Sequence, residues 1–261
     1  MSATTHDSRA CTGGGDPQLS VVIPAYNEEK HIVATIETLM EFLNRGPKPY
    51  EIIVVDDGST DATAEFVERF SQDGCPVTLV RGDRNCGKGR AVRRGMSVAR
   101  GAYQFFMDAD LSYPVEDIAT MLAQLQDGCD IVIGSRALAE SHMEVRPPLR
   151  RYLAGRAYSS LIQIFLMRGI PDTQCGFKGF ERVAAQTLFS RLTLDGWAFD
   201  VELLFLARKF GYRLQMIPVR LTFAKETSKV RLFSHSVQMF LDLLRIRFND
   251  VRGVYGRPET R

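Results

Sequence analysis

Paired cysteines, long apolar runs and an excess of one charge are all missing from this 261-residue sequence. The five cysteines contain no Cys-x-x-Cys pair and are odd in number, which favours reduced thiols in a cytosolic compartment over structural disulfides. No apolar run approaches the roughly 20 residues of a membrane span, so we do not expect a protein integral to a membrane. The formal net charge of +2 gives no sign of whole-protein attraction to nucleic acid.

Residues 1–16 also lack any apolar stretch, and they are polar and rich in glycine. We therefore expect a disordered tail there rather than a signal peptide. Across the whole chain 45% of the residues are hydrophobic, enough to bury a large core as one domain.

Apolar runs at residues 19–23, 51–55, 77–80 and 103–107 alternate with helix-like stretches, the first of which Asn27 is expected to cap. Such alternation predicts parallel strands joined by right-handed crossovers, in a doubly wound α/β layer. Ligands bind such layers at the edge where the strands end. Tyr26, Asp57, Lys88 and Asp108 are all predicted to lie at that edge.

The Asp-Ala-Asp motif at residues 108–110 follows the last of these apolar runs. Two carboxylates at the end of a buried strand suit a divalent ion that carries a substrate diphosphate. The alternative is a surface turn in which Asp110 caps the following residues. For the similar Asp56-Asp57 pair, we expect one carboxylate to cap a turn and the other to bind a ligand.

Three strings together carry a family resemblance: Pro-Ala-Tyr-Asn-Glu at 24–28, Val-Val-Asp-Asp-Gly-Ser-Thr-Asp at 54–61, and the motif at 108–110. They resemble the inverting nucleotide-sugar glycosyltransferases of the GT-A fold, glycosyltransferase family 2. The strings at 172–178 (Asp-Thr-Gln-Cys-Gly-Phe-Lys) and 197–204 (Trp-Ala-Phe-Asp-Val-Glu-Leu-Leu) resemble its dolichyl-phosphate beta-glucosyltransferase branch. That branch moves glucose from UDP-glucose to a polyprenyl phosphate.

The resemblance implies a GT-A, Rossmann-like α/β fold whose mostly parallel sheet is flanked by helices. It places a catalytic domain at 17–227 and a C-terminal amphipathic helix and tail at 228–261. Mannosyl relatives usually carry Gln where this chain has Ser112, which weakens the alternative of a polyprenyl-phosphate mannosyltransferase using GDP-mannose. A non-catalytic nucleotide-sugar-binding protein is the other alternative. A processive polysaccharide synthase is disfavoured, because no Gln-x-x-Arg-Trp motif is present.

A sugar bonded to a diphosphate leaves with negative charge developing on the phosphates, and Mg²⁺ or Mn²⁺ on Asp108 and Asp110 would stabilise that charge. Asp57 is expected to accept a hydrogen bond from the base, with Tyr26 as an aromatic face and Pro24 as a rigid wall. The residues predicted to bind the nucleotide sugar are Pro24, Tyr26, Glu28, Val55, Asp57, Lys88, Asp108 and Ala109.

The acceptor phosphate needs cations, and we predict Arg136 and Lys229 to bind it. Most of the other arginines between 146 and 156 are expected only to solvate a helix face. A phosphate is already ionised at neutral pH, so positioning should matter more than proton removal. By resemblance, Asp172 orients the nucleophile or takes a late proton, and we count it with Asp110 as catalytic. Asp200 and Glu202 are the alternatives for this role, or they cap the helix at 200–210.

The segment at 230–248 sets apolar residues against basic ones, as a helix at a membrane surface does. A helix at 153–167 is a second candidate contact. Both could instead pack on the domain or form a homodimer. The expected location is cytoplasmic, peripheral at the inner face of a membrane.

Overall fold

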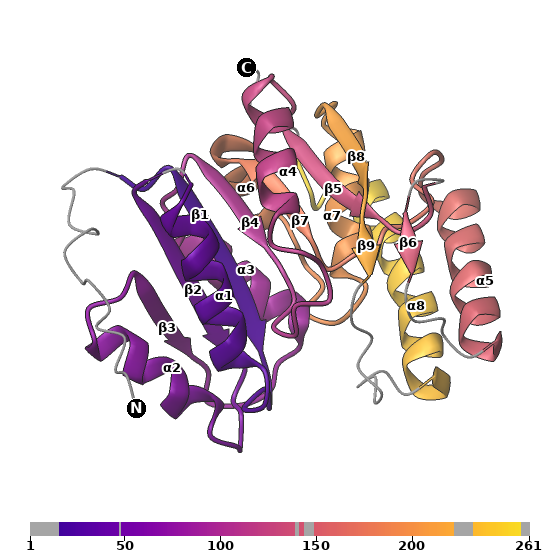
Figure 1. Cartoon of the computed structure of the whole chain (residues 1–261). Helices are drawn as coiled ribbons and strands as arrows, with labels where there is room; N and C mark the ends of the chain where they lie inside the picture. The colour runs from indigo at the N-terminus through magenta and orange to yellow at the C-terminus, as the bar shows by residue number, and fades with distance from the viewer. Residues whose placement is uncertain (1–15, 47, 139–140, 144–148, 222–231, 257–261) are drawn as a thin grey trace.

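The computed structural model describes residues 16–46, 48–138, 141–143, 149–221 and 232–256. Within them, one seven-stranded sheet has the strand order β3-β2-β1-β4-β7-β5-β8, and a second sheet pairs β6 with β9 (Figure 1). The strands are β1 (Leu19–Ala25), β2 (Tyr50–Asp56), β3 (Val77–Arg81), β4 (Tyr103–Phe106), β5 (Ile131–Ser135), β6 (His142–Met143), β7 (Lys178–Glu181), β8 (Leu214–Pro218) and β9 (Arg220–Leu221).

The described chain also contains eight helices, of which α1 to α7 lie between strands and α8 follows the last strand. They are α1 (Ile32–Asn44), α2 (Thr63–Gln72), α3 (Lys88–Val98), α4 (Asp117–Gln126), α5 (Leu149–Phe165), α6 (Arg182–Phe189), α7 (Phe199–Lys209) and α8 (Leu232–Val251). None of the described helices is long and apolar enough to cross a membrane.

The sheet is mostly parallel, as predicted. Strands β3, β2, β1 and β4 run in one direction, and β8 is parallel to β5. The exception is β7, which is antiparallel to both of its neighbours, β4 and β5. The parallel strands bring the residues that follow β1, β2 and β4 to one edge of the sheet.

Side chains that alternate along β1 enter two different cores. Val22 packs in the cluster that contains residues of α3, α6 and α7, whereas Val21 and Ile23 pack in the cluster that contains residues of α1 and α4. Because successive residues of a strand point to opposite faces, a strand covered on both sides has to be apolar along most of its length. This explains the continuous apolar run from which the strand was predicted.

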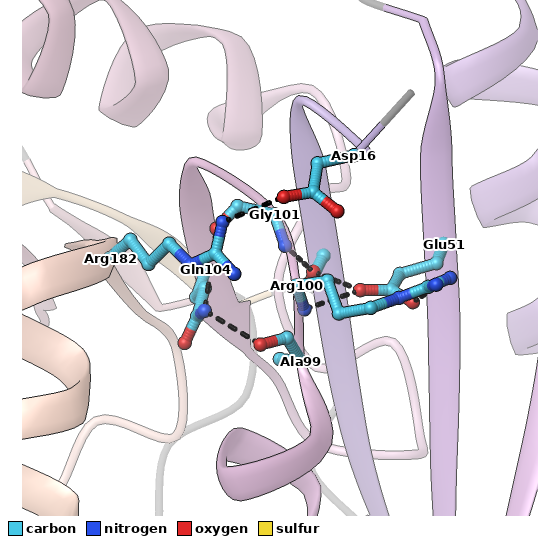
Figure 2. Close-up of polar contacts among 8 residues, drawn as sticks. Asp16, Glu51, Ala99, Arg100, Gly101, Gln104 and Arg182 are labelled. Carbon is cyan, nitrogen blue, oxygen red and sulfur yellow. Dashed lines mark hydrogen bonds and ion pairs between the residues drawn. The ribbon is translucent and has the colours of Figure 1, made fainter. Parts of the chain in front are cut away.

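The other ends of β1, β2 and β4 are joined by polar contacts (Figure 2). Glu51 accepts hydrogen bonds from the Ser20 hydroxyl at 2.6 Å and from the Arg100 backbone N–H at 2.7 Å. The Gly101 N–H donates to the Ser20 hydroxyl at 2.8 Å, and Gln104 donates to the Ala99 carbonyl at 3.0 Å. These contacts fix the register of the strands at the end that carries none of the predicted site residues.

Three expectations about helices need correction. Helix α1 starts at Ile32 and not directly after Asn27, which lies in the left-handed region at φ 52°. The Asn27 side chain instead accepts a hydrogen bond from the Thr60 N–H at 2.8 Å, so it joins two loops at the strand ends. Helix α5 begins and ends earlier than the predicted 153–167, and α8 continues three residues beyond the predicted segment.

Candidate active site

Asp57 directly follows β2 and is buried, with its carboxylate against the turn that starts α3. It accepts hydrogen bonds from the Cys86 N–H at 3.0 Å and the Gly87 N–H at 2.8 Å. Burial raises the pKa of Asp57, and these two backbone donors offset only part of that rise. Asp56 accepts from the Ser59 N–H at 3.1 Å, so it supports the turn. Asp57, which is predicted to accept a hydrogen bond from the nucleotide base, therefore also holds the loop before Lys88.

Lys88 and Asp108 form an ion pair at the edge where β4 ends. The Lys88 ammonium lies 2.6 Å from Asp108 Oδ1 and 5.6 Å from the centre of the Trp197 ring. Burial alone would lower the pKa of Lys88, but the charges of Asp108 and Asp200 raise it. The ammonium is therefore charged at neutral pH, next to the first carboxylate of the Asp-Ala-Asp motif.

Asp110 is held by its own loop. Its Oδ1 accepts from the Ser112 hydroxyl at 2.5 Å and from the Ser112 N–H at 3.1 Å. Burial and the neighbouring charge of Asp108 raise the pKa of Asp110. The carbonyl of Ala109 accepts from the Thr35 hydroxyl at 2.8 Å, which ties this loop to α1. The Asp108 carboxylate thus lies close enough to disfavour the ionisation of Asp110.

Gly176 makes room for the Asp108 carboxylate. A Cβ at this position would lie 2.0 Å from Asp108 Oδ2 and 2.5 Å from its Cγ. Since no side chain fits in that space, glycine lets the segment before β7 pass directly over the carboxylate. The string at 172–178 and the Asp-Ala-Asp motif are therefore parts of one site.

The donor set fits a hard divalent ion. Asp108 and Asp110 offer carboxylate oxygens, which Mg²⁺ and Mn²⁺ prefer, and their mutual repulsion would be relieved by a cation. Among the described residues no group of three or more His, Cys, Asp or Glu side chains could hold a metal. Mg²⁺ at such sites is usually bound by one or two carboxylates together with substrate phosphates and water, and a pair of carboxylates matches that number.

Arg136 and Asp172 form a forked ion pair on the other side of the site. Arg136 donates from Nε at 2.8 Å, from Nη2 at 2.8 Å and from its backbone N–H at 2.9 Å. Burial would raise the pKa of Asp172, but the hydrogen bonds and charge of Arg136 lower it below its usual value. Asp172 is thus an ionised carboxylate held in place, which suits orientation better than proton uptake.

Lys178 and Asp200 form a second ion pair, beneath the site. The ammonium lies 2.6 Å from Asp200 Oδ1 and donates to the Cys175 carbonyl at 2.6 Å, with side-chain exposures of 0% and 4%. Asp200 therefore neither caps α7 nor reaches solvent, and its charge also acts on Lys88. Cys175 is fully buried, and burial raises its thiol pKa to about 11, as expected of a packing residue.

The other predicted site residues lie as follows. Pro24 sits beside Val55 in the register of β1 and β2, and the Val55 side chain is buried in the core with α3, so only its backbone could reach a ligand. The backbone N–H of Glu28 donates to the Thr63 hydroxyl at 2.8 Å, and Tyr26 is half-buried. Lys229 lies outside the described residues.

Comparisons with known proteins show the family to which this chain belongs. The model of the family "Glycosyl transferase family 2" matches residues 20–189, which include both carboxylates of the Asp-Ala-Asp motif. This chain belongs to glycosyl transferase family 2. Within this family, it is 37% identical to the dolichyl-phosphate beta-glucosyltransferase of Dictyostelium discoideum over 91% of the chain and 76% of that protein. It is also 37% identical to the Homo sapiens protein of that name, over 94% and 79%.

Solved structures confirm the predicted GT-A fold for this family 2 member. The crystal structure of glucosyl-3-phosphoglycerate synthase from Mycobacterium tuberculosis with Mn²⁺, UDP and phosphoglyceric acid matches with a TM-score of 0.68 at 21% identity. The match covers 94% of this chain and 80% of that one. A crystal structure of the same synthase with Mg²⁺ and UDP matches equally well.

The sequence of this family 2 chain did not predict the contacts of three residues, Lys178, Trp197 and Glu202. Lys178 was not singled out, although a lysine between Phe177 and Gly179 in an apolar strand signals a buried partner. Trp197 belongs to the string at 197–204 that carries the family resemblance, but no contact with Lys88 was predicted for it. Glu202 was a candidate for the acceptor side, but it is fully buried and accepts from the backbone of Thr193 and Leu194. Nothing in the sequence pattern marks that contact.

Proposed function

We propose that this chain transfers glucose from UDP-glucose to a polyprenyl phosphate, with inversion at the sugar and with Mg²⁺ or Mn²⁺. The observation that carries the proposal is the convergence of Asp57, Lys88, Asp108 and Asp110 at one edge of the sheet. The dolichyl-phosphate beta-glucosyltransferases that resemble the chain support glucose as the sugar and a polyprenyl phosphate as the acceptor.

On the donor side, Asp57 accepts a hydrogen bond from the base next to the wall formed by Pro24 and Tyr26. Asp108 and Asp110 would hold the divalent ion, which would supply positive charge for the departing diphosphate. Lys88 already faces Asp108 and adds a second cation at the phosphates. Negative charge grows on the diphosphate as its bond to the sugar breaks, so positive charges already in place there stabilise the transition state more than the ground state.

On the acceptor side, Arg136 binds the phosphate and Asp172 orients it. The pair uses Nε and Nη2 of the guanidinium, so Nη1 remains to donate to a phosphate oxygen. That oxygen attacks the anomeric carbon on the face opposite the diphosphate, the carbon–oxygen bond to UDP breaks, and the product has the inverted configuration. No proton has to be removed from an ionised phosphate, which agrees with an Asp172 of lowered pKa.

A donor panel tests this proposal. The full chain is incubated with Mg²⁺ or Mn²⁺, a short polyprenyl phosphate and either UDP-glucose or GDP-mannose, and the lipid product is identified by mass. We expect a hexosyl lipid phosphate from UDP-glucose and a much slower reaction with GDP-mannose. Faster transfer from GDP-mannose would refute the glucosyl assignment. Binding of UDP-glucose without any lipid product would favour the non-catalytic alternative.

We also propose that α5 and α8 bring the enzyme to the membrane, at its cytoplasmic face. The two helices lie side by side at one end of the molecule, next to β6 and β9 (Figure 1). Exposed apolar side chains follow one side of α8 at four-residue spacing: Phe240, Leu244 and Phe248. Leu243 and Ile246 of the same helix are buried, so α8 packs on the domain with one face and presents a second apolar face.

The charges and energies of this surface suit reversible membrane binding. Ile164 and Phe165 at the end of α5 are also exposed, and Arg245 and Arg247 lie on the exposed part of α8. Each apolar side chain buried at an interface would contribute about 1.5 to 3 kcal/mol at most. Each arginine would add about 1 kcal/mol near anionic lipid. The alternative is that a second copy of this chain binds the same apolar face and forms a homodimer.

Paired variants distinguish the membrane from a dimer. Leu244→Ser with Phe248→Ser should abolish sedimentation with anionic vesicles, while UDP binding stays unchanged. The matched control is Val98→Ser with Val183→Ser, which removes two equally exposed apolar side chains from α3 and α6. If the first pair instead turns a dimer into a monomer and vesicle binding persists, the face is a subunit interface.

A further inference from the structure

The loop at residues 192–198 joins α6 to α7 and lies against the start of α3. Arg93 of α3 donates to the Leu192 carbonyl at 2.7 Å and to the Asp195 carboxylate at 2.7 Å. The Arg90 N–H donates to the Asp195 carbonyl at 3.2 Å. This 192–198 loop is therefore fastened along the first turns of the helix that begins with Lys88.

The same loop reaches the donor side of the site. Its Trp197 ring lies 5.6 Å from the Lys88 ammonium. Gly87, whose N–H donates to Asp57, passes so close to the loop that a Cβ there would lie 2.5 Å from the Asp195 carbonyl oxygen. A shift of the 192–198 loop would therefore displace both Lys88 and the turn that Asp57 holds.

A buried carboxylate holds the loop from the opposite side. Glu202 of α7 is fully buried and accepts four hydrogen bonds, three of them from the loop. Thr193 donates its N–H at 3.0 Å and its hydroxyl at 2.6 Å, and the Leu194 N–H donates at 2.9 Å. A charged acceptor with several donors forms hydrogen bonds stronger than neutral ones, so this carboxylate is the main anchor of the loop.

The fourth donor comes from the end of the described chain. The Tyr255 hydroxyl donates to Glu202 Oε1 at 2.8 Å, and the Tyr255 side chain is 1% exposed. Asn249 of α8 donates to the Thr193 hydroxyl at 3.0 Å. Helix α8 is thus bonded to the loop through Asn249, and Tyr255, four residues beyond the end of that helix, is bonded to Glu202. All of these anchor residues lie beyond residue 189, where the match to the family model ends.

We propose that Tyr255 and Glu202 are positioning residues for the donor site, acting through the 192–198 loop on Trp197 and Lys88. The proposal rests on the proposed binding of UDP-glucose at Asp57, Lys88 and Asp108. The affinity for UDP then depends on how α8 and the residues after it pack on the domain, although neither Tyr255 nor Glu202 touches the donor.

The test compares Tyr255→Phe with Tyr50→Phe in the full chain. Tyr50 is a matched control, because it is 6% exposed and its hydroxyl donates one hydrogen bond to Asn44 at 3.0 Å, outside the site. Trp197 is the only tryptophan in the sequence, so intrinsic fluorescence reports the loop directly. Binding of UDP with Mn²⁺ is measured by calorimetry, and unfolding by urea.

We expect Tyr255→Phe to raise the dissociation constant for UDP by about fivefold and to make Trp197 more accessible to acrylamide, since a hydrogen bond to a buried charge is lost. Tyr50→Phe should change neither quantity, even where the two variants lose equal stability. If Tyr255→Phe unfolds more easily but keeps the UDP affinity and the quenching of the wild type, the tyrosine only packs, and the proposal is wrong. If the wild type itself does not bind UDP, the proposed donor fails, and the quenching of Trp197 still decides whether Tyr255 holds the loop.

Discussion

Replacing Gly176 with alanine tests whether the placement of Asp108 is essential. The added Cβ would lie 2.0 Å from Asp108 Oδ2 and 2.8 Å from Oδ1. Non-bonded heavy atoms pack at about 3.5 Å, so the carboxylate has to move by about 1.5 Å. The side chain of Asp108 is 32% exposed, and it can rotate toward solvent without disturbing the core. The expected damage is therefore local to the site.

The magnitude follows from what that movement breaks. The 2.6 Å ion pair with Lys88 is lost, and one of the two proposed metal ligands leaves its position. A displacement of about 1 Å in a catalytic group can cost about a hundredfold in rate, which corresponds to about 2.7 kcal/mol in the activation barrier. The free energy of unfolding should change by less than about 2 kcal/mol, because the side chain that moves is only half-buried.

The assay is glucosyl transfer from UDP-glucose at several Mn²⁺ concentrations, with urea unfolding in parallel. Gly46→Ala is the control, because a Cβ there makes only ordinary contact, at 3.7 Å from the Leu43 carbonyl beyond the end of α1. We expect Gly176→Ala to need more Mn²⁺ and to turn over about a hundredfold more slowly, while Gly46→Ala matches the wild type. A fully active Gly176→Ala protein would show that the position of Asp108 is not needed.

Three further changes test the charges of the site. Asp110→Asn should lower turnover by about a hundredfold or more, about 3 kcal/mol, without lowering the urea midpoint, because burial already disfavours the charge at this position. Because the pKa of Asp172 is lowered in the folded protein, its ion pair stabilises the fold above the unfolded-state pKa, and this stabilisation is lost as the pH falls through the folded-state pKa. Asp172→Asn should therefore lower the free energy of unfolding at pH 7 by about 1 to 3 kcal/mol. The variant should also show a weaker dependence of stability on pH below about pH 4. An unchanged acid transition would contradict the pairing with Arg136. Lys178→Met leaves Asp200 buried without its partner, so urea unfolding should show a loss of about 3 to 5 kcal/mol.

The strands at the centre of the sheet could be predicted because their residues are buried on both faces. The runs at 19–23, 51–55 and 103–107, which became β1, β2 and β4, are apolar except for Ser20, Glu51 and Gln104 near their starts. The carboxylates Asp57 and Asp108 come within two residues of the ends of β2 and β4. Strand β7 gave no such signal. Its four residues include Lys178 and Glu181, and it is placed by antiparallel pairing with strands distant in sequence.

The amino-acid pattern alone predicts the α/β class, the edge of the sheet at which the candidate site lies, and the pair of carboxylates at that edge. These properties follow from local apolar patterning and from the order of strands and helices. The partner of each charged residue, in contrast, depends on the three-dimensional packing. Arg136 meets Asp172 and Lys178 meets Asp200 across 36 and 22 positions, and Tyr255 meets Glu202 across 53. Such partners are chosen by how the helices pack on the sheet, because a buried charge has to find its counterpart in space, wherever that residue lies along the chain.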